Sequence, residues 1–238
     1  MKKSILLTLA VATVATIASA QEYKPAAGSK TIELQLAPLG GSPISIGGLR
    51  FRSFSSETSA MRADVFLGYS SKTTITQQAV ATTGFVRPEL KEKKSSMEIS
   101  LMPGMEMHMA GTDRFSPYMA YVLDLGWKSS SDKQEHQNWP VNGSTDTSTV
   151  KSTTTKGKDG FIRLGLGLAF GADYYLAKKI YIGAECGLGL GFKKMSKIKT
   201  KETNDLPTGA TATPDQTQGG ELNFGPTVNA KFRLGWNF

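Results

Sequence analysis

Glu106 and His108 are the residues of this chain whose types and spacing most directly suggest chemistry. In an extended segment, side chains two positions apart point to the same side, where a carboxylate and an imidazole can hold a metal ion or transfer a proton. The only other histidine, His136, lies in a polar stretch that we expect to be exposed to solvent. A hydrogen-bond network is the simpler interpretation of the pair, and we predict neither a metal site nor a catalytic site.

Two glycine-rich stretches, "GLGLAFG" at 165–171 and "GAECGLGLG" at 183–191, invite comparison with phosphate-binding loops. Such a loop needs its glycines at a turn from a strand into a helix, whereas both stretches continue as an alternation typical of strands. We therefore expect no nucleotide and no other cofactor. Cys186, the single cysteine, falls on the apolar side of the second stretch and is interpreted as an inert filler rather than a reactive thiol.

Charged residues recur on the polar side of similar segments along the whole chain. The acidic members are Glu33, Asp64, Glu98, Glu106, Asp124, Asp173, Glu185 and Glu221, and the basic members are Arg50, Arg52, Arg62, Arg163, Lys193, Lys231 and Arg233. Eight acids against seven bases is close to balance. Because buried charges must be paired or hydrogen-bonded, this near-balance predicts that the residues form a charge network within one enclosed lumen.

The elements that must position these charges are predicted from a sequence period of two, which indicates strands with one apolar and one polar face. Eight segments show it: 31–39, 44–54, 60–70, 98–109, 116–127, 161–176, 180–194 and 221–238. The last alternates without interruption and ends on Phe238, a longer run than strands of soluble proteins usually show. A strand that crosses a bilayer shows the same alternation over roughly 9–11 residues.

The connections between these segments are of two kinds. Three are short: "SSETS", "AGTDRF" and "AKK". Three are long and polar, Lys72–Lys94, Lys128–Asp159 and Ser196–Gly219, and we predict them to be loops. Short turns at one end of a set of strands and long loops at the other are typical of bacterial outer-membrane barrels. The connection near "GGSPIS" is short and breaks this pattern.

Periodicity alone leaves open which face of the strands is interior. A soluble, ligand-binding barrel of the lipocalin type has its apolar face inside. Here the polar face is rich in glycine, with seven glycines in two neighbouring segments, namely Gly165, Gly167, Gly171, Gly183, Gly187, Gly189 and Gly191. Glycine weakens a strand, but within a narrow ring it makes room for long side chains from the opposite wall. We therefore predict that the polar face is the interior.

The amino-terminal segment 1–20 has the features of a secretory signal peptide: Lys2 and Lys3, an apolar stretch, and "ASA" before a cleavage site after Ala20. Its removal lowers the net charge from +8 to +6, because it carries two lysines and no acid. A lone cysteine gives no disulfide framework. We expect a short periplasmic segment at 21–29 and one barrel domain at 30–238.

With these features the chain resembles the small outer-membrane β-barrel proteins of Gram-negative bacteria, of the OmpA-barrel and OmpX type. The resemblance rests on the signal peptide, the strand count, the alternation of short turns and long loops, and the closing "FRLGWNF". It implies that the outer-membrane assembly machinery reads the final strand. Phe232, Leu234, Trp236 and Phe238 would then be the assembly signal. We expect no peptidoglycan-binding domain after the barrel, so a cell-wall tether is not implied.

The expected fold is thus all-β: an eight-stranded, antiparallel, up-and-down transmembrane β-barrel in the bacterial outer membrane. The expected function is non-enzymatic, either structural or in surface interaction. A small-solute channel is the main alternative, and a secreted soluble ligand-binding barrel is a further one. The expected partners are outer-membrane lipid, lipopolysaccharide facing the lysine-bearing loops, and the assembly machinery, with no nucleic acid. We expect a monomer.

Overall fold

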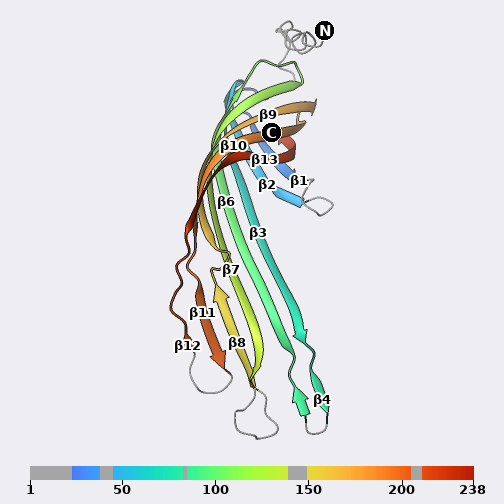
Figure 1. The fold of residues 1–238 in the computed structure, drawn as a ribbon. Coiled ribbons are helices and arrows are strands. Elements are labelled where there is room, and N and C mark those ends of the chain that lie inside the picture. The colour runs from blue at the N-terminus through green and yellow to red at the C-terminus, as the bar shows by residue number, and fades with distance from the viewer. Residues whose placement is uncertain (1–22, 38–44, 83–84, 139–148, 205–210) are drawn as a thin grey trace, which may run out of the picture.

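The structure, a computed structural model, describes residues 23–37, 45–82, 85–138, 149–204 and 211–238 (Figure 1). Its strands are β1 (Lys30–Ala37), β2 (Ser45–Ser56), β3 (Ser59–Gln77), β4 (Val80–Thr82), β5 (Phe85–Arg87), β6 (Leu90–His108), β7 (Phe115–Asn138), β8 (Thr149–Lys156), β9 (Phe161–Ala177), β10 (Ile180–Met195), β11 (Lys199–Asn204), β12 (Thr211–Ala212) and β13 (Gly220–Asn237). The described ranges contain no helix that is long and apolar enough to cross a membrane. The predicted signal peptide and its cleavage site lie outside them.

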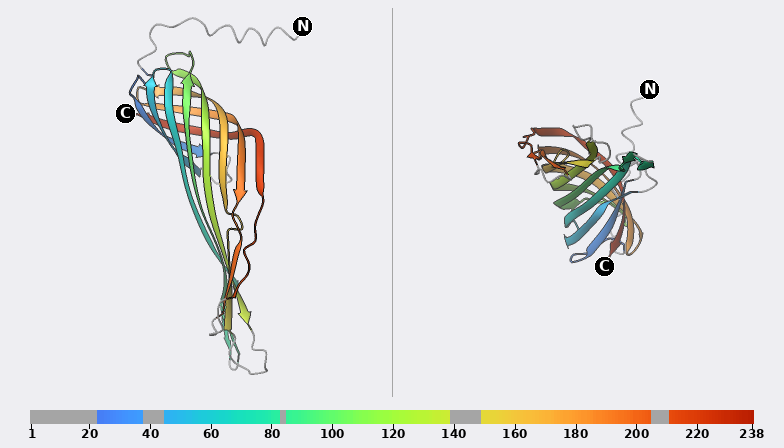
Figure 2. Two further views of the ribbon diagram at one scale, coloured as in Figure 1. Left: turned by 90° about the vertical axis from the view of Figure 1, so that its left-hand side faces the viewer. Right: turned by 90° about the horizontal axis from the view of Figure 1, so that it is seen from below.

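Eight of the strands form a closed ring. They pair antiparallel in the order β1, β2, β3, β6, β7, β9, β10 and β13, and β13 pairs back onto β1, where Ile32 lies opposite Trp236. The ring also needs the pairing of β7 with β9, which sets Leu123 opposite Leu166. Figure 2 shows these strands wrapped around a common axis. The prediction of an all-β chain with eight antiparallel strands is confirmed, since each predicted segment corresponds to one strand of the ring.

The alternation of side chains divides the ring into two faces. Along β9, Phe161 and Ala169 are buried, while Leu166 and Phe170 project outward and are 64 % and 45 % exposed. This follows from the period of two, because successive side chains of a strand point to opposite sides. The outward face is therefore apolar, and the polar and glycine-rich face lies inside.

The long polar segments are largely strands, which differs from the prediction of loops. β3 continues to Gln77, β6 begins at Leu90 and β7 runs to Asn138, and β8, β11 and β12 join them. These strands extend the sheet beyond the ring in the order β12-β11-β8-β7-β6-β3 (Figure 1). The segments lack apolar alternation because most of their side chains are partly or fully exposed. Backbone pairing and the β-branched threonines nevertheless favour strands here.

The ring is much taller on one side than on the other. β1 and β2 are short, whereas β3, β6 and β7 continue far beyond them (Figure 1). β2 pairs with β3 only as far as Val65, and β1 pairs with β13 only from Phe232 to Asn237. Within the described residues, the rest of β3 and the rest of β13 therefore each pair on one side only.

The segment 23–29 lies against the end of the ring that carries the short turns. The backbone nitrogen of Gly28 donates to the carbonyl of Phe54 at 2.8 Å. The Arg114 guanidinium donates to the Tyr23 hydroxyl at 2.9 Å and also lies over its ring. The chain thus enters β1 at this end, near the carboxyl terminus, where the backbone nitrogen of Phe238 donates to the carbonyl of Lys30.

Interior glycines are of two kinds. At Gly171 and Gly235, a Cβ atom would overlap the rings of Tyr118 and Tyr181, so these glycines receive bulky side chains from neighbouring strands. At Gly191 and Gly225, a Cβ atom would meet no atom within 4 Å. The interior is therefore filled to contact near the short turns and leaves unfilled space further along the axis.

We expect Gly171→Val to lower the free energy of unfolding by about 1–3 kcal/mol, the usual cost of overpacking a filled interior. The reason is that Tyr118 is buried and its hydroxyl is bound to Glu185, so its ring cannot move aside without breaking that hydrogen bond. Urea unfolding followed by tryptophan fluorescence measures the change. Gly191→Val is the matched control and is expected to cost little, because its Cβ has room. Equal losses of unfolding free energy in the two variants would contradict the division of the interior glycines into packed and unpacked positions.

Candidate functional site

The interior of the ring is built on arginine. Arg50, Arg52 and Arg233 are among the largest fully buried side chains in the described residues, and Arg62 is only 4 % exposed. Buried guanidinium groups require carboxylate partners and full hydrogen bonding. The structure supplies both, in a set that we call the arginine–carboxylate cluster. Its members are Arg50, Arg52, Arg62, Arg233, Glu33, Asp64, Glu106, Asp173 and Glu185.

One half of the cluster joins Arg50 and Arg62 to the same two carboxylates. Arg50 donates hydrogen bonds from Nε and Nη2 to the two carboxylate oxygens of Asp64, each at 2.7 Å. Its Nη1 lies 2.9 Å from Glu185 Oε2. Arg62 Nη1 donates to Glu185 at 2.8 Å, and its Nη2 donates to Asp64 at 3.0 Å. Bidentate pairing of this kind is the geometry that best offsets the desolvation of both charges.

The other half joins Arg52 and Arg233 around Glu33 and Asp173. Arg52 Nη1 lies 2.8 Å from Asp173 and 2.9 Å from Glu106, and its Nε lies 2.8 Å from Glu33. Arg233 donates to Glu33 at 3.0 Å and to Asp173 at 2.9 Å. Arg52 thus contacts three carboxylates, each from a different strand of the ring.

Hydroxyl and imidazole groups complete the cluster. Tyr118 donates to Glu185 at 2.6 Å, and Tyr181 donates to Glu33 at 2.8 Å. His108 lies between Glu106, with Nε2 at 3.3 Å, and the hydroxyl of Ser116, with Nδ1 at 2.9 Å. With Tyr118 on β7, all eight strands of the ring contribute a side chain.

The imidazole of His108 is thus part of the hydrogen-bond network, as we predicted for the pair with Glu106. In the described part of the chain, no group of three His, Cys, Asp or Glu side chains is placed to hold a metal ion. Cys186 is exposed on the outward face, where the sequence pattern placed it.

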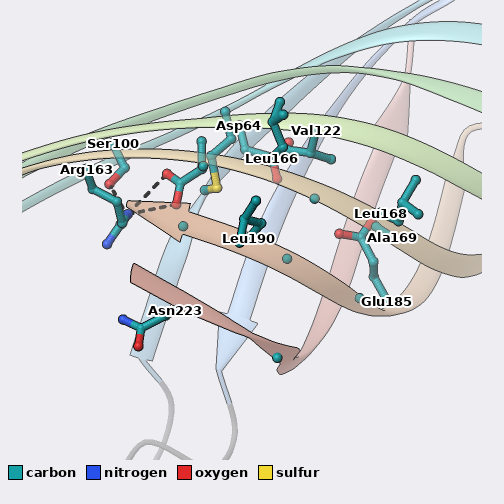
Figure 3. Close-up of a pocket in the computed structure, with 18 of the residues that line it drawn as sticks. Asp64, Ser100, Val122, Arg163, Leu166, Leu168, Ala169, Glu185, Leu190 and Asn223 are labelled. Atoms are coloured by element: carbon teal, nitrogen blue, oxygen red, sulfur yellow. Dashed lines mark hydrogen bonds and ion pairs between the residues drawn. The ribbon is translucent and has the colours of Figure 1, made fainter. Parts of the chain in front are cut away.

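A second, more exposed group of charges lies further along the axis. Arg163 is about one-third exposed, and its Nε lies 2.7 Å from Asp124 while Nη1 lies 3.8 Å from Glu98. Its Nη2 also donates to the hydroxyl of Ser100 at 3.0 Å. Figure 3 shows Arg163 beside Ser100.

The fifteen charged residues that the sequence predicted to share one lumen thus lie in different parts of the structure. Nine form the arginine–carboxylate cluster, and Glu98, Asp124 and Arg163 form the second group. Lys193 lies over the ring of Phe161, with Nζ 4.5 Å from the centroid. Glu221 is exposed, and the side chain of Lys231 lies outside the described part.

The residues of the predicted assembly signal all lie on the outward face of β13 and the chain end. Phe232, Leu234, Trp236 and Phe238 are each about half exposed. Sequence reasoning did not single out Tyr118, Tyr181 or Gln35 as members of the network. Gln35 donates to Asp64 at 2.8 Å. The alternation could have identified all three. Each lies an even number of positions from a charged residue of its own strand, so its side chain points to the same face as that charge.

A cavity of about 640 Å³ lies beside the cluster (Figure 3). Its inner end is formed by Arg62, Asp64 and Glu185 of the cluster. The second charge group and Lys193 line it further out. The remaining wall comes from apolar side chains and from glycines of β9, β10 and β13. The cavity therefore ends at the cluster rather than passing through it.

Comparison with protein-family models, with characterised proteins and with solved structures finds no match for this chain. The function must therefore be argued from the geometry of the ring itself.

We expect Arg52→Ala to lower the free energy of unfolding by about 3–5 kcal/mol, the cost of leaving buried charges without their partner. The three carboxylates that Arg52 contacts would remain buried with fewer cationic partners: Glu33 and Asp173 would keep Arg233, and Glu106 would keep Arg62 at 3.3 Å. Urea unfolding measures the loss, with the Arg52→Ala/Glu106→Ala double variant reporting how much of it comes from the charge of Glu106.

Arg163→Ala is the matched control, since Arg163 also faces the lumen and pairs with acids but is partly solvated. It should cost about 1 kcal/mol or less. A loss for Arg163→Ala as large as that for Arg52→Ala would show that burial does not set the energetics of these pairs.

Proposed function

We propose that this chain is a β-barrel that spans the outer membrane of a Gram-negative bacterium and has a non-enzymatic, structural or surface-interacting role. The single observation that carries the proposal is the distribution of charge and apolar area, which is inverted relative to a soluble protein. The largest fully buried side chains are arginines, while leucine, phenylalanine and tryptophan side chains project outward. Soluble proteins bury their apolar side chains and almost never bury unpaired charges.

The outward apolar face continues around the ring. It includes Ile32, Leu49, Phe51, Met61, Val65, Leu67, Ile99, Leu101, Tyr121, Leu125, Trp127, Leu164, Leu166, Phe170, Ile182, Leu188, Phe192, Phe232, Leu234 and Trp236, each 37–67 % exposed. A contiguous patch of this kind far exceeds what a soluble monomer leaves in water. A secreted, soluble ligand-binding barrel is disfavoured for the same reason, because its apolar face would have to be inside.

The orientation in the membrane is proposed from the two ends of the ring. The end of the ring with the short turns, where β1 begins and β13 ends, would face the periplasm. The extended polar sheet would project outward from the cell. Lysines on that sheet, such as Lys133 and Lys151, could then contact the anionic groups of lipopolysaccharide. The resemblance to OmpA-type and OmpX-type barrels supports the same arrangement.

The carboxyl-terminal aromatic face is proposed to be read during assembly. Phe232, Leu234, Trp236 and Phe238 lie on one face of the strand that closes the ring, and they are exposed on its outward side. The outer-membrane assembly machinery would then be a transient partner, and the inserted protein would be a monomer surrounded by lipid.

A small-solute channel is the weaker alternative. An eight-stranded barrel has an interior just wide enough for side chains to fill. The arginine–carboxylate cluster fills it here, because its buried members come from all parts of the wall. The geometry therefore supports a closed lumen with a structural core rather than a pore.

We expect Leu166→Arg to reduce insertion into outer membranes, because an outward arginine within the bilayer costs about 2–4 kcal/mol near its midplane. Leu166 is on the outward face of β9 and is 64 % exposed. The test is fractionation of cells that express the variant, together with the heat-modified mobility of the folded barrel in gels.

Thr73→Arg is the matched control, since Thr73 lies on the part of β3 that extends beyond the ring and is exposed. It should leave insertion unchanged. If Leu166→Arg inserts as well as the parent chain, or if the parent chain fractionates with soluble proteins, the membrane assignment is wrong.

We expect the purified protein to give no stable stepwise currents in planar lipid bilayers. The Arg62→Ala/Glu185→Ala variant removes an opposed pair from the cluster and should give new currents, because its space opens to water. Arg163→Ala should give none, since Arg163 lies outside the constriction. Stable currents from the parent chain that change with these substitutions would favour the channel instead.

A further inference from the structure

The cavity beyond the arginine–carboxylate cluster is the feature of the ring that the closed-core function leaves unexplained. Its volume of about 640 Å³ lies within the range of roughly 300–1,000 Å³ that is typical of small-molecule sites. It is closed at one end by Arg62, Asp64 and Glu185, which are tied to one another. A cavity with a closed inner end has the geometry of a binding site rather than of a passage.

One wall of the cavity is rich in glycine. Gly167 lies opposite Gly189, and Gly189 lies opposite Gly225, so that glycines adjoin across β9, β10 and β13. Gly191 lies opposite Gly165 in the next row. All five line the cavity, and together they present a surface of backbone peptide groups.

Packing does not require glycine at several of these positions. A Cβ at Gly191 or Gly225 would meet no atom within 4 Å, and at Gly167 its nearest neighbour would be 3.5 Å away, an ordinary contact. Glycine weakens a strand and often marks a place where a ligand approaches the backbone closely. The space in front of this wall is therefore preserved at some cost to the sheet.

The wall formed by β3, β6 and β7 supplies apolar contacts. Phe66 and Met102 line the cavity from β3 and β6, and Val122 lines it from β7, where it is the register neighbour of Gly167. A flat ring lying on the glycine wall would have an aromatic side chain and a thioether on its other side and a branched aliphatic group at its edge. Aromatic rings and methionine sulfur both pack favourably against such a ring.

The charges near the outer part of the cavity differ in how well they are paired. Arg163 is matched by Asp124 and Glu98. Lys193 is the neighbour of Arg163 in register and rests over Phe161, and no ion pair links it to any described residue. Glu221 is its register neighbour on β13 but is exposed and forms no ion pair with it in the described structure. An anionic group is the complement that Lys193 lacks.

From these observations we propose that the cavity binds a small aromatic carboxylate, with its ring on the glycine wall and its carboxylate at Lys193. The site goes beyond the proposed structural role and does not depend on it, because binding requires the folded ring and not its location in a cell.

The test uses 6-hydroxy-2-naphthoate, a fluorescent aromatic carboxylate, titrated into the protein folded in a non-ionic detergent. Saturable binding with about one molecule per chain is expected. Lys193→Gln should weaken it at least tenfold, and Gly191→Leu, which places a bulky side chain in front of the glycine wall, should abolish it. The corresponding neutral amide should bind the parent chain at least tenfold more weakly than the carboxylate.

Lys133→Gln is the matched control, because Lys133 is an exposed lysine on the extended sheet. It should bind like the parent chain, and circular dichroism should show that every variant is folded. Binding that is absent in the folded parent chain, or that survives both Lys193→Gln and Gly191→Leu, overturns the site. Neither result bears on membrane insertion, which the fractionation of Leu166→Arg tests separately.

Discussion

The pairing of buried arginines with carboxylates is the interaction on which the rest of this structure depends. A guanidinium group taken out of water costs several kcal/mol unless its charge and its hydrogen bonds are matched. Arg50 and Arg62 meet this requirement by sharing Asp64 and Glu185, which come from β3 and β10. The partners of each arginine lie on different strands, so the ring must close before the charges are satisfied.

The size of the interior follows from the same constraint. Long side chains must cross the lumen to reach their partners, and they need glycines beside them to do so. Gly183 faces the Arg233 guanidinium and the Asp173 carboxylate, and Gly235 faces the Tyr181 ring. Where the cluster ends, the glycines continue, and at Gly191 and Gly225 no side chain occupies the space beside them, which leaves the cavity. Glycine thus makes room for long side chains at the level of the cluster and leaves open space at the level of the cavity.

The cluster also limits what the protein can do. A core of mutually paired charges stabilises the ring but occupies the path that a solute would need. The cavity and the extended sheet lie beyond the cluster. The proposed structural role and the proposed binding site therefore use different parts of one ring, with Arg62, Asp64 and Glu185 at their boundary.

Local alternation was sufficient to predict the eight strands of the ring and the side of each strand that carries its charges. The direction of a side chain in a strand depends only on its position in the chain, and this is why Glu33, Arg50 and Asp173 could be assigned to one face. The extension of β3, β6 and β7 beyond the ring could not be predicted in this way, since their polar stretches are held as strands by pairing with neighbours.

The partners within the cluster were likewise decided only by the tertiary structure. Arg50 and Glu185 are 135 positions apart, and their contact depends on the register and closure of the whole ring. Residue types and phases are local properties, so the sequence was enough to predict that acids and bases share one face of the ring. Which of them pair, which glycines receive a ring, and where a cavity remains depend on distances across the lumen, and these exist only once the ring has closed.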